Sequence, residues 1–182
     1  LAQGIQPAAT LFHWDLPAPL EADGGWLQRD TAEAFADYAR VVAERLADRV
    51  AMWMPVNEPN VVTTLGYSTG MHAPGRTLGL YALPVAHHLL LGHGLAVGAL
   101  RAAGAASVGS AQNHTIVWPS SDREQDRAAA DLFDTVFNRL YADPVLLGRY
   151  PEGLGEMMPG PVEQDLRIIS APLDFYGFNY YN

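Results

Sequence analysis

The sequence contains no cysteine. Disulfides and thiolate zinc sites are therefore excluded, and the redox compartment stays open. Basic residues are also scarce: 11 Lys and Arg stand against 20 Asp and Glu, which gives a formal net charge of −9. We do not expect nucleic acid as a partner, because phosphate binding requires a basic surface. Charged residues make up 17% of the chain and hydrophobic residues 49%, which predicts a folded chain with a buried core.

The chain also lacks an uninterrupted apolar run of membrane-spanning length. Its longest apolar stretch, residues 79–100, is interrupted by Pro84 and by three histidines. We therefore expect no membrane span. No basic-then-apolar signal segment follows Leu1, and the alanine- and arginine-rich composition is typical of bacteria. These features favour a bacterial cytoplasmic protein.

Four short apolar runs predict buried strands, because each is followed by polar or turn residues. They cover residues 7–14, 50–57, 106–113 and 173–182. Pro55 is awkward in the second strand, since proline cannot donate a backbone hydrogen bond to a neighbour.

Helical patterns separate the predicted strands. Helices are expected over residues 30–49, over 79–103, from Ser121 onward and near 163–169. Asp30 with Glu33, and Ser121 with Glu124, have the spacing of capping boxes. Gly104 follows the second pattern, where a helix-ending glycine is expected.

The alternation of strands and helices predicts a parallel sheet with helical crossovers in a single domain, residues 1–182. An open doubly wound sheet and a (β/α)8 TIM barrel both fit this order. The glycine-rich phosphate loops that would favour a nucleotide-binding sheet are missing. Polar residues instead follow the strands, at His13, Asn57–Glu58, Asn113 and Asn179–Tyr181. A barrel gathers its functional groups at this carboxyl-terminal rim, so the pattern favours the barrel.

Five motifs in register resemble those of glycoside hydrolase family 1, the β-glucosidase family. They are LFHWDLP (11–17), VNEP (56–59), GYSTGMHAPG (66–75), DPVLLGRYP (143–151) and FYGFNYY (175–181). The resemblance implies an eight-stranded barrel of which this chain supplies strands three to six. It also implies a retaining β-glycosidase that needs water but no metal and no other cofactor.

The resemblance assigns roles to the residues at the rim. Glu58 matches the acid/base glutamate, and Asn57 matches the asparagine that contacts the sugar 2-hydroxyl. His13 matches a histidine that donates to sugar hydroxyls, and its neighbour Trp14 is a sugar contact or a packing residue. Asn179 and Tyr181 complete the expected substrate-binding set; the family's tyrosine bonds the nucleophile.

The nucleophile itself is expected outside this chain. In the family it is a glutamate in an E-N-G motif at strand seven, and no E-N-G occurs here. Retaining glycosidases place two carboxyl groups about 5–5.5 Å apart. Asp15 and Asp174 are weak substitutes, because Asp15 belongs to the H-W-D-L-P motif and Asp174 precedes its strand. We expect the missing barrel half, or a second copy pairing through open sheet edges, as a partner.

Other interpretations remain open for several residues. Taken alone, Glu58 is an exposed loop carboxylate and Asn57 a helix cap. The histidines at 87, 88 and 93 invite a metal site, but their spacing does not place three rings on one helical face. Asn60 stands where the family often has an aromatic residue, so an aglycone platform is expected to be lost. The alternative function is an inactive truncated fragment or a sugar-binding relic, and the sugar itself (glucose, galactose, fucose or 6-phosphoglucose) is undetermined.

Overall fold

All four predicted strands are present, and they are parallel. The computed structural model describes residues 3–181. The strands are β1 (Ala8–Phe12), β2 (Met52–Val56), β3 (Gly109–Asn113) and β4 (Phe175–Asn179). β1 pairs with β2 and β3 with β4, while the bridges Trp53–Val108 and Asn57–Ala111 join β2 to β3. The spatial order therefore follows the sequence order, and the carboxyl ends of all four strands lie at one edge.

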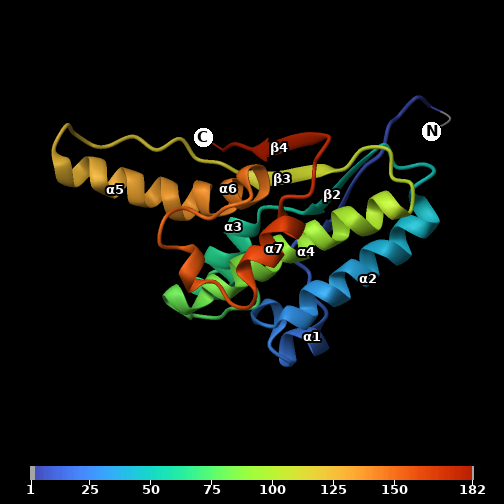
Figure 1. The fold of residues 1–182 in the computed structure, drawn as a ribbon, viewed down its shortest axis with the longest axis horizontal. Helices are drawn as coiled ribbons and strands as arrows, with labels where there is room; N and C mark the ends of the chain where they lie inside the picture. The colour runs from blue at the N-terminus through green and yellow to red at the C-terminus, as the bar shows by residue number, and fades with distance from the viewer. Residues whose placement is uncertain (1–2, 182) are drawn as a thin grey trace.

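Helices connect each strand to the next. They are α1 (Ala18–Ala22), α2 (Arg29–Leu46), α3 (Pro59–Val61), α4 (Leu83–Ala102), α5 (Glu124–Asp134), α6 (Leu140–Leu147) and α7 (Val162–Ile169). Shorter helical turns are η1 (Gly25–Leu27), η2 (Val62–Ser68), η3 (Gly79–Ala82), η4 (Thr135–Arg139) and η5 (Gly155–Met157). Figure 1 shows α2, α4 and α7 together on one side of the strands.

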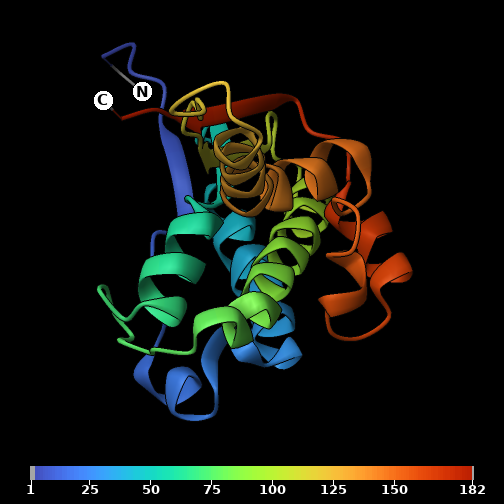
Figure 2. The ribbon, with the colours of Figure 1, turned by 90° about the vertical axis from the view of Figure 1, so that its left-hand side faces the viewer.

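Helix α4 is the centre of the hydrophobic core. It contacts α2, α7 and β2, and most of its residues are buried. By length and composition the stretch Gly79–Ala102 could cross a membrane, but 72% of its apolar window is buried inside the structure. Such burial is typical of a core helix. In Figure 2 this helix runs through the middle of the molecule.

The carboxyl end of α4 forms as predicted. Gly104 has φ of 85°, a left-handed conformation that glycine adopts without a steric penalty. Its N–H donates to the carbonyl of Arg101, and the N–H of Ala105 donates to that of Leu100. These two bonds form a Schellman motif, which satisfies the last carbonyl groups of the helix.

Neither predicted capping box is formed. Helix α2 begins at Arg29 with Gln28 as its N-cap, so Asp30 lies in the first turn. Glu33 forms an ion pair with Arg29 at 3.5 Å instead of reaching back to the backbone.

The second predicted box fails in a different way. Helix α5 begins at Glu124 with Arg123 as its N-cap, two residues after Ser121. The Ser121 hydroxyl accepts the Arg123 N–H at 3.3 Å and also contacts the carboxylate of Asp126. Ser121 therefore organises the turn that precedes the helix, and Glu124 takes no part in a box.

Pro55 is accommodated by a bulge in β2. Between the two bridges that join these strands, β2 advances by four residues and β3 by three. The N–H groups of Trp53 and Glu58 donate to carbonyls on the β3 side, and Pro55 lies between them. An extra residue within a strand disrupts the ladder locally, so the missing proline N–H leaves no bond unmade.

Helix α5 extends away from the body of the molecule (Figure 1). Its stripe of apolar residues is largely exposed: Leu132 is 63% exposed and Phe133 46%. The helical path continues through η4 into α6, where Leu140 is buried. The helix predicted from Ser121 onward is thus formed by α5, η4 and α6 in succession, and Pro144 lies inside α6.

Candidate active site

Polar side chains from three strand ends meet at the carboxyl edge of the sheet. His13 and Trp14 follow β1, and Asn57 and Glu58 follow β2. Asn179 is the last residue of β4, and Tyr181 lies two residues beyond it. The structure therefore places all six predicted site residues at the same end of the strands, as the parallel order requires.

Glu58 is the most buried carboxylate at this edge, with 2% of its surface exposed. The side-chain amide of Asn179 donates to its Oε1 at 2.5 Å, and the hydroxyl of Tyr181 donates to the same oxygen at 3.1 Å. The Asn179 amide also donates to Oδ1 of Asn57 at 3.3 Å. Within residues 3–181, no hydrogen bond reaches Oε2 of Glu58, so one oxygen is fixed and the other remains available.

These contacts cross the intervening strand β3. Asn57 is level with Ala111 of β3, and Ala111 is in turn paired with Gly177 of β4. Asn179 itself is paired with Asn113, two residues further along β3, so its side chain reaches back across β3 to the end of β2.

The backbone of the site has an unusual conformation. Glu58 has φ of 47° and ψ of 62°, and Trp14 has φ of 80°. Within residues 3–181 these are the only residues other than glycine with positive φ. A left-handed conformation costs a residue with a side chain on the order of 1–3 kcal/mol, so its neighbours must hold it in place.

Trp14 makes a specific contact with the backbone of β2. Its indole N–H donates to the carbonyl of Asn57 at 3.0 Å. Its ring is close to two imidazoles: the ring centroids are 5.2 Å apart for His13 and 5.5 Å apart for His72. His13 is exposed, as a group that contacts a ligand must be.

Tyr181 is also exposed, and its hydroxyl faces Glu58. The hydrogen bond to Glu58, together with the negative charge of that carboxylate, raises the pKa of Tyr181. The phenol therefore stays protonated in the neutral pH range and donates a hydrogen bond to Glu58. In this structure it bonds the acid/base candidate itself.

The other two carboxylates considered from the sequence lie elsewhere. Asp174 accepts the backbone N–H of Val108 at 2.8 Å and pairs with Arg101 at 3.2 Å. Since Val108 precedes β3, Asp174 lies at the opposite end of the strands, as predicted. Asp15 is exposed and lines an apolar hollow of about 290 Å³ beside β1 and α2, which none of the six site residues lines.

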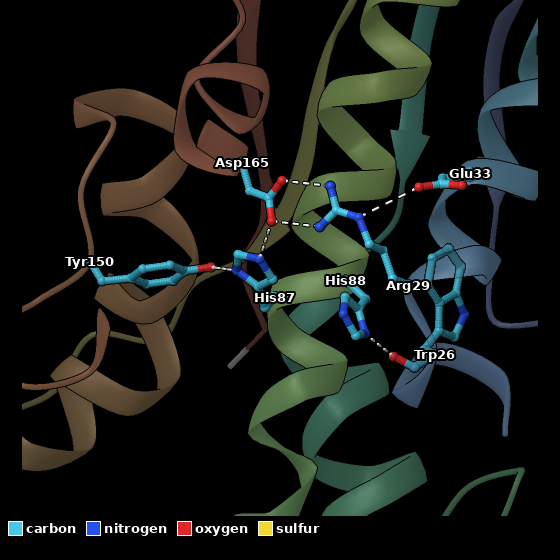
Figure 3. A network of polar contacts seen from close by, with 7 residues as sticks. All are labelled: Trp26, Arg29, Glu33, His87, His88, Tyr150 and Asp165. Atoms are coloured by element: carbon cyan, nitrogen blue, oxygen red, sulfur yellow. Dashed lines mark hydrogen bonds and ion pairs between the residues drawn. The ribbon is translucent and has the colours of Figure 1, made fainter. Parts of the chain in front are cut away.

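His87 of α4 belongs to a buried network of a different kind (Figure 3). The guanidinium group of Arg29 donates two hydrogen bonds, of 2.6 and 2.7 Å, to the carboxylate of Asp165 on α7. His87 Nε2 lies 3.1 Å from the same carboxylate, and His87 Nδ1 lies 2.8 Å from the hydroxyl of Tyr150. Because the carboxylate can only accept, Nε2 carries the proton and Nδ1 accepts from Tyr150. Burial lowers the pKa of His87, which agrees with a neutral ring.

The remaining histidines of α4 are also in the core. His88 donates from Nδ1 to the carbonyl of Trp26 at 3.0 Å (Figure 3). His93 is 2% exposed, and its Nε2 has no hydrogen-bond partner within the described chain. Across residues 3–181, no set of three His, Cys, Asp or Glu side chains is placed to share a metal ion.

Asn60 lies inside the protein, and sequence reasoning missed this. It is 1% exposed, and its side-chain amide donates to the carbonyls of Asn113 at 3.0 Å and Phe137 at 3.3 Å. The side chain thus ties α3 to the end of β3 and to η4. At this position the chain offers no side chain to an aglycone.

The whole chain, residues 1–182, matches the family model described as glycosyl hydrolase family 1. The chain belongs to this family. It is 44% identical to beta-glucosidase A of Acetivibrio thermocellus over 190 aligned residues, and 44% identical to the beta-glucosidase of an Agrobacterium species over 185. All of this chain is covered in the first comparison and 99% in the second, but only 42% and 40% of those proteins. The family 1 chain thus spans about two fifths of the length of these relatives.

Solved structures similar in sequence to this chain have the same fold. The virulence factor SghA of Agrobacterium tumefaciens matches 99% of this chain and 41% of its own, with 43% identity and a TM-score of 0.94. The psychrophilic beta-glucosidase BglU of Micrococcus antarcticus matches 99% and 40%, with 45% identity and a TM-score of 0.92. The predicted fold class is confirmed: the four strands and their helices are part of a (β/α)8 barrel.

Two features of the site could not be seen in the sequence. The resemblance pointed to Trp14, but not to its hydrogen bond with the Asn57 carbonyl. His72 had no signal beyond its place in the GYSTGMHAPG motif, and the structure sets its ring against that of Trp14. Both contacts join segments that are more than forty residues apart in the chain.

Proposed function

We propose that the full-length protein carrying this chain is a retaining β-glycosidase in which Glu58 is the acid/base residue. One observation carries the proposal. In a family 1 chain, the buried Glu58 presents Oε2 without a hydrogen-bond partner among the described residues, while Asn179 and Tyr181 fix Oε1. A proton donor needs this arrangement, because one oxygen must stay oriented while the other exchanges its proton with the leaving group.

The substrate class is proposed from the relatives. Those compared above are named β-glucosidases, and SghA has been solved with the substrate analog salicin. We propose a β-linked glucoside or a related β-glycoside as the substrate. In this proposal His13 and Asn57 bind sugar hydroxyls beside Glu58. Trp14, Asn179 and Tyr181 form the rest of the sugar-binding site.

The proposed reaction proceeds by double displacement. A glutamate from outside these 182 residues attacks the anomeric carbon, while Glu58 protonates the departing oxygen. Glu58 then accepts a proton from water, which attacks the glycosyl-enzyme and releases the sugar with retained configuration. The nucleophile must approach within about 5–5.5 Å of Glu58, and the strand ends of the missing barrel half are the elements that would carry it.

Replacement of Glu58 by Gln in the full-length protein tests this role. Alkyl β-glucosides, which need a protonated leaving group, should lose about 10²–10⁴-fold in kcat. Dinitrophenyl glucosides should keep a faster first step, and added azide should restore turnover and give a β-glycosyl azide. Glu33→Gln, at an exposed position on α2, is the matched control and should change neither rate. An equal loss for all leaving groups without azide rescue would contradict the assignment.

A further inference from the structure

We propose that Trp14 is a positioning residue that fixes the peptide group between Asn57 and Glu58 and so aims the Glu58 carboxyl group. This inference rests on the proposed function of Glu58, because it concerns how that group is aligned.

The Asn57–Glu58 peptide is held through both of its polar atoms, from opposite sides. Its carbonyl oxygen accepts the indole N–H of Trp14 at 3.0 Å, from the β1 side. Its N–H donates to the carbonyl of Ala111 at 2.7 Å, on the β3 side. Rotation of this peptide plane would break both bonds, so its orientation is fixed by the two neighbouring strands.

The conformation that these bonds hold is one that the chain would not adopt alone. Glu58 is left-handed, with φ of 47°, and Trp14, which supplies the indole, is left-handed as well. A left-handed residue with a side chain persists only where its surroundings over-determine it. The two positive-φ residues are thus the two ends of one hydrogen-bonded unit, and each supports the conformation of the other.

The indole itself packs against a second ring, that of His72. The His72 ring lies 5.5 Å from the Trp14 ring and is tilted by 36°. His72 is anchored by its backbone, because its N–H donates to Leu65 at 2.9 Å and its carbonyl accepts from Gly75 at 2.8 Å. The loop that follows η2 therefore backs the indole that holds the peptide of Glu58.

Loss of this bond should affect proton donation more than substrate binding. A displacement of about 1 Å in a catalytic group can reduce the rate of the chemical step on the order of 10²-fold. Trp14→Phe keeps an aromatic ring next to the two imidazoles and removes the N–H donor together with part of the ring. Trp53→Phe on β2 is the matched control, because its buried indole N–H has no partner within residues 3–181.

The test compares kcat and KM of the full-length protein and these two variants on an alkyl and a dinitrophenyl β-glucoside. For Trp14→Phe we expect kcat on the alkyl glucoside to fall at least about 10-fold, with a much smaller loss on the dinitrophenyl glucoside and little change in KM. Trp53→Phe should lower the melting temperature and leave the ratio of the two kcat values unchanged. A Trp14→Phe variant that loses both activities equally, or that changes KM alone, would overturn the inference.

A second measurement separates this inference from the proposed function. If the unmodified full-length protein hydrolyses neither glucoside, the proposed function fails, and a crystal structure of Trp14→Phe then decides the positioning role. A rotated Asn57–Glu58 peptide, or a Glu58 that has left the positive-φ region, supports the inference. An unmoved peptide with Glu58 still at positive φ overturns it.

Discussion

The buried histidine at position 93 should make the protein sensitive to mild acid. His93 is 2% exposed, and burial lowers its pKa to about 4. The ordinary histidine pKa is about 6.5, so the folded state binds the proton more weakly than the unfolded chain does. The stability contributed by neutral His93 is therefore fully present above about pH 6.5 and is lost as the pH falls toward about 4. For this one group the loss is on the order of 2–3 kcal/mol at about pH 4.5.

His93→Leu and His93→Gln remove the titrating group in two chemically different ways. Urea unfolding of the full-length protein at about pH 7 and about pH 4.5 gives the loss of unfolding free energy in mild acid. Over this interval the unfolding free energy of each variant should fall by less than that of the unmodified protein, with a difference on the order of 2–3 kcal/mol.

Val97→Ala, one turn further along α4, is the control for this experiment. Val97 is buried, and its truncation leaves a cavity without changing a titratable group. Its destabilisation should be equal at both pH values. If both His93 variants lose as much stability in acid as the unmodified protein does, His93 is not the group that titrates.

Two further results are expected. Asp165→Asn in the full-length protein should lower the free energy of unfolding by about 3 kcal/mol in urea, because it leaves Arg29 and His87 without their charged partner. The control is Asp37→Asn, which removes one partner of the exposed pair with Arg40 and should change the free energy of unfolding by less than about 0.5 kcal/mol. Equal effects of the two substitutions would contradict a stabilising role of the Asp165 network. The 182-residue segment alone should not hydrolyse aryl β-glucosides and should associate through the unpaired edges of β1 and β4 in size-exclusion chromatography. A monomer with turnover that Glu58→Gln abolishes would show that the nucleophile lies within the segment.

The strands and the place of the site could be predicted because they depend on local patterns. A short apolar run followed by a polar pair indicates both a buried strand and its carboxyl end. Parallel order then brings Asn57, Glu58 and Asn179 to one edge, where the structure has them. The helix starts were predicted less well, because Glu33 had a competing partner in Arg29 that the spacing rule does not consider.

The exact conformation of Glu58 could not be predicted, because residues from other strands and loops determine it. No local pattern shows that the carbonyl of Asn57 meets an indole 43 positions earlier in the chain. The same is true of Asn60, whose carbonyl partners Asn113 and Phe137 are 53 and 77 positions away. Local propensity assigns Asn60 to a turn or cap. Only the tertiary structure shows that its buried side chain joins three segments by hydrogen bonds.

Pro55 connects these observations. In the sequence it counts against a central strand, yet β2 lies between β1 and β3. The bulge resolves the conflict and also shifts the strand by one residue: Trp53, Pro55 and Val56 are all buried, with Trp53 in one hydrophobic cluster and Val56 in the other. The same shift changes the alternation of the backbone donors: the N–H of Asn57 donates to Phe12 of β1, while the N–H groups of Trp53 and Glu58, five residues apart, both donate to the β3 side. In a regular strand the direction of the backbone N–H alternates at every residue, so two residues five positions apart would donate to opposite neighbours. The irregularity that accommodates the proline therefore also turns Glu58 out of the strand and into the peptide orientation that Trp14 holds.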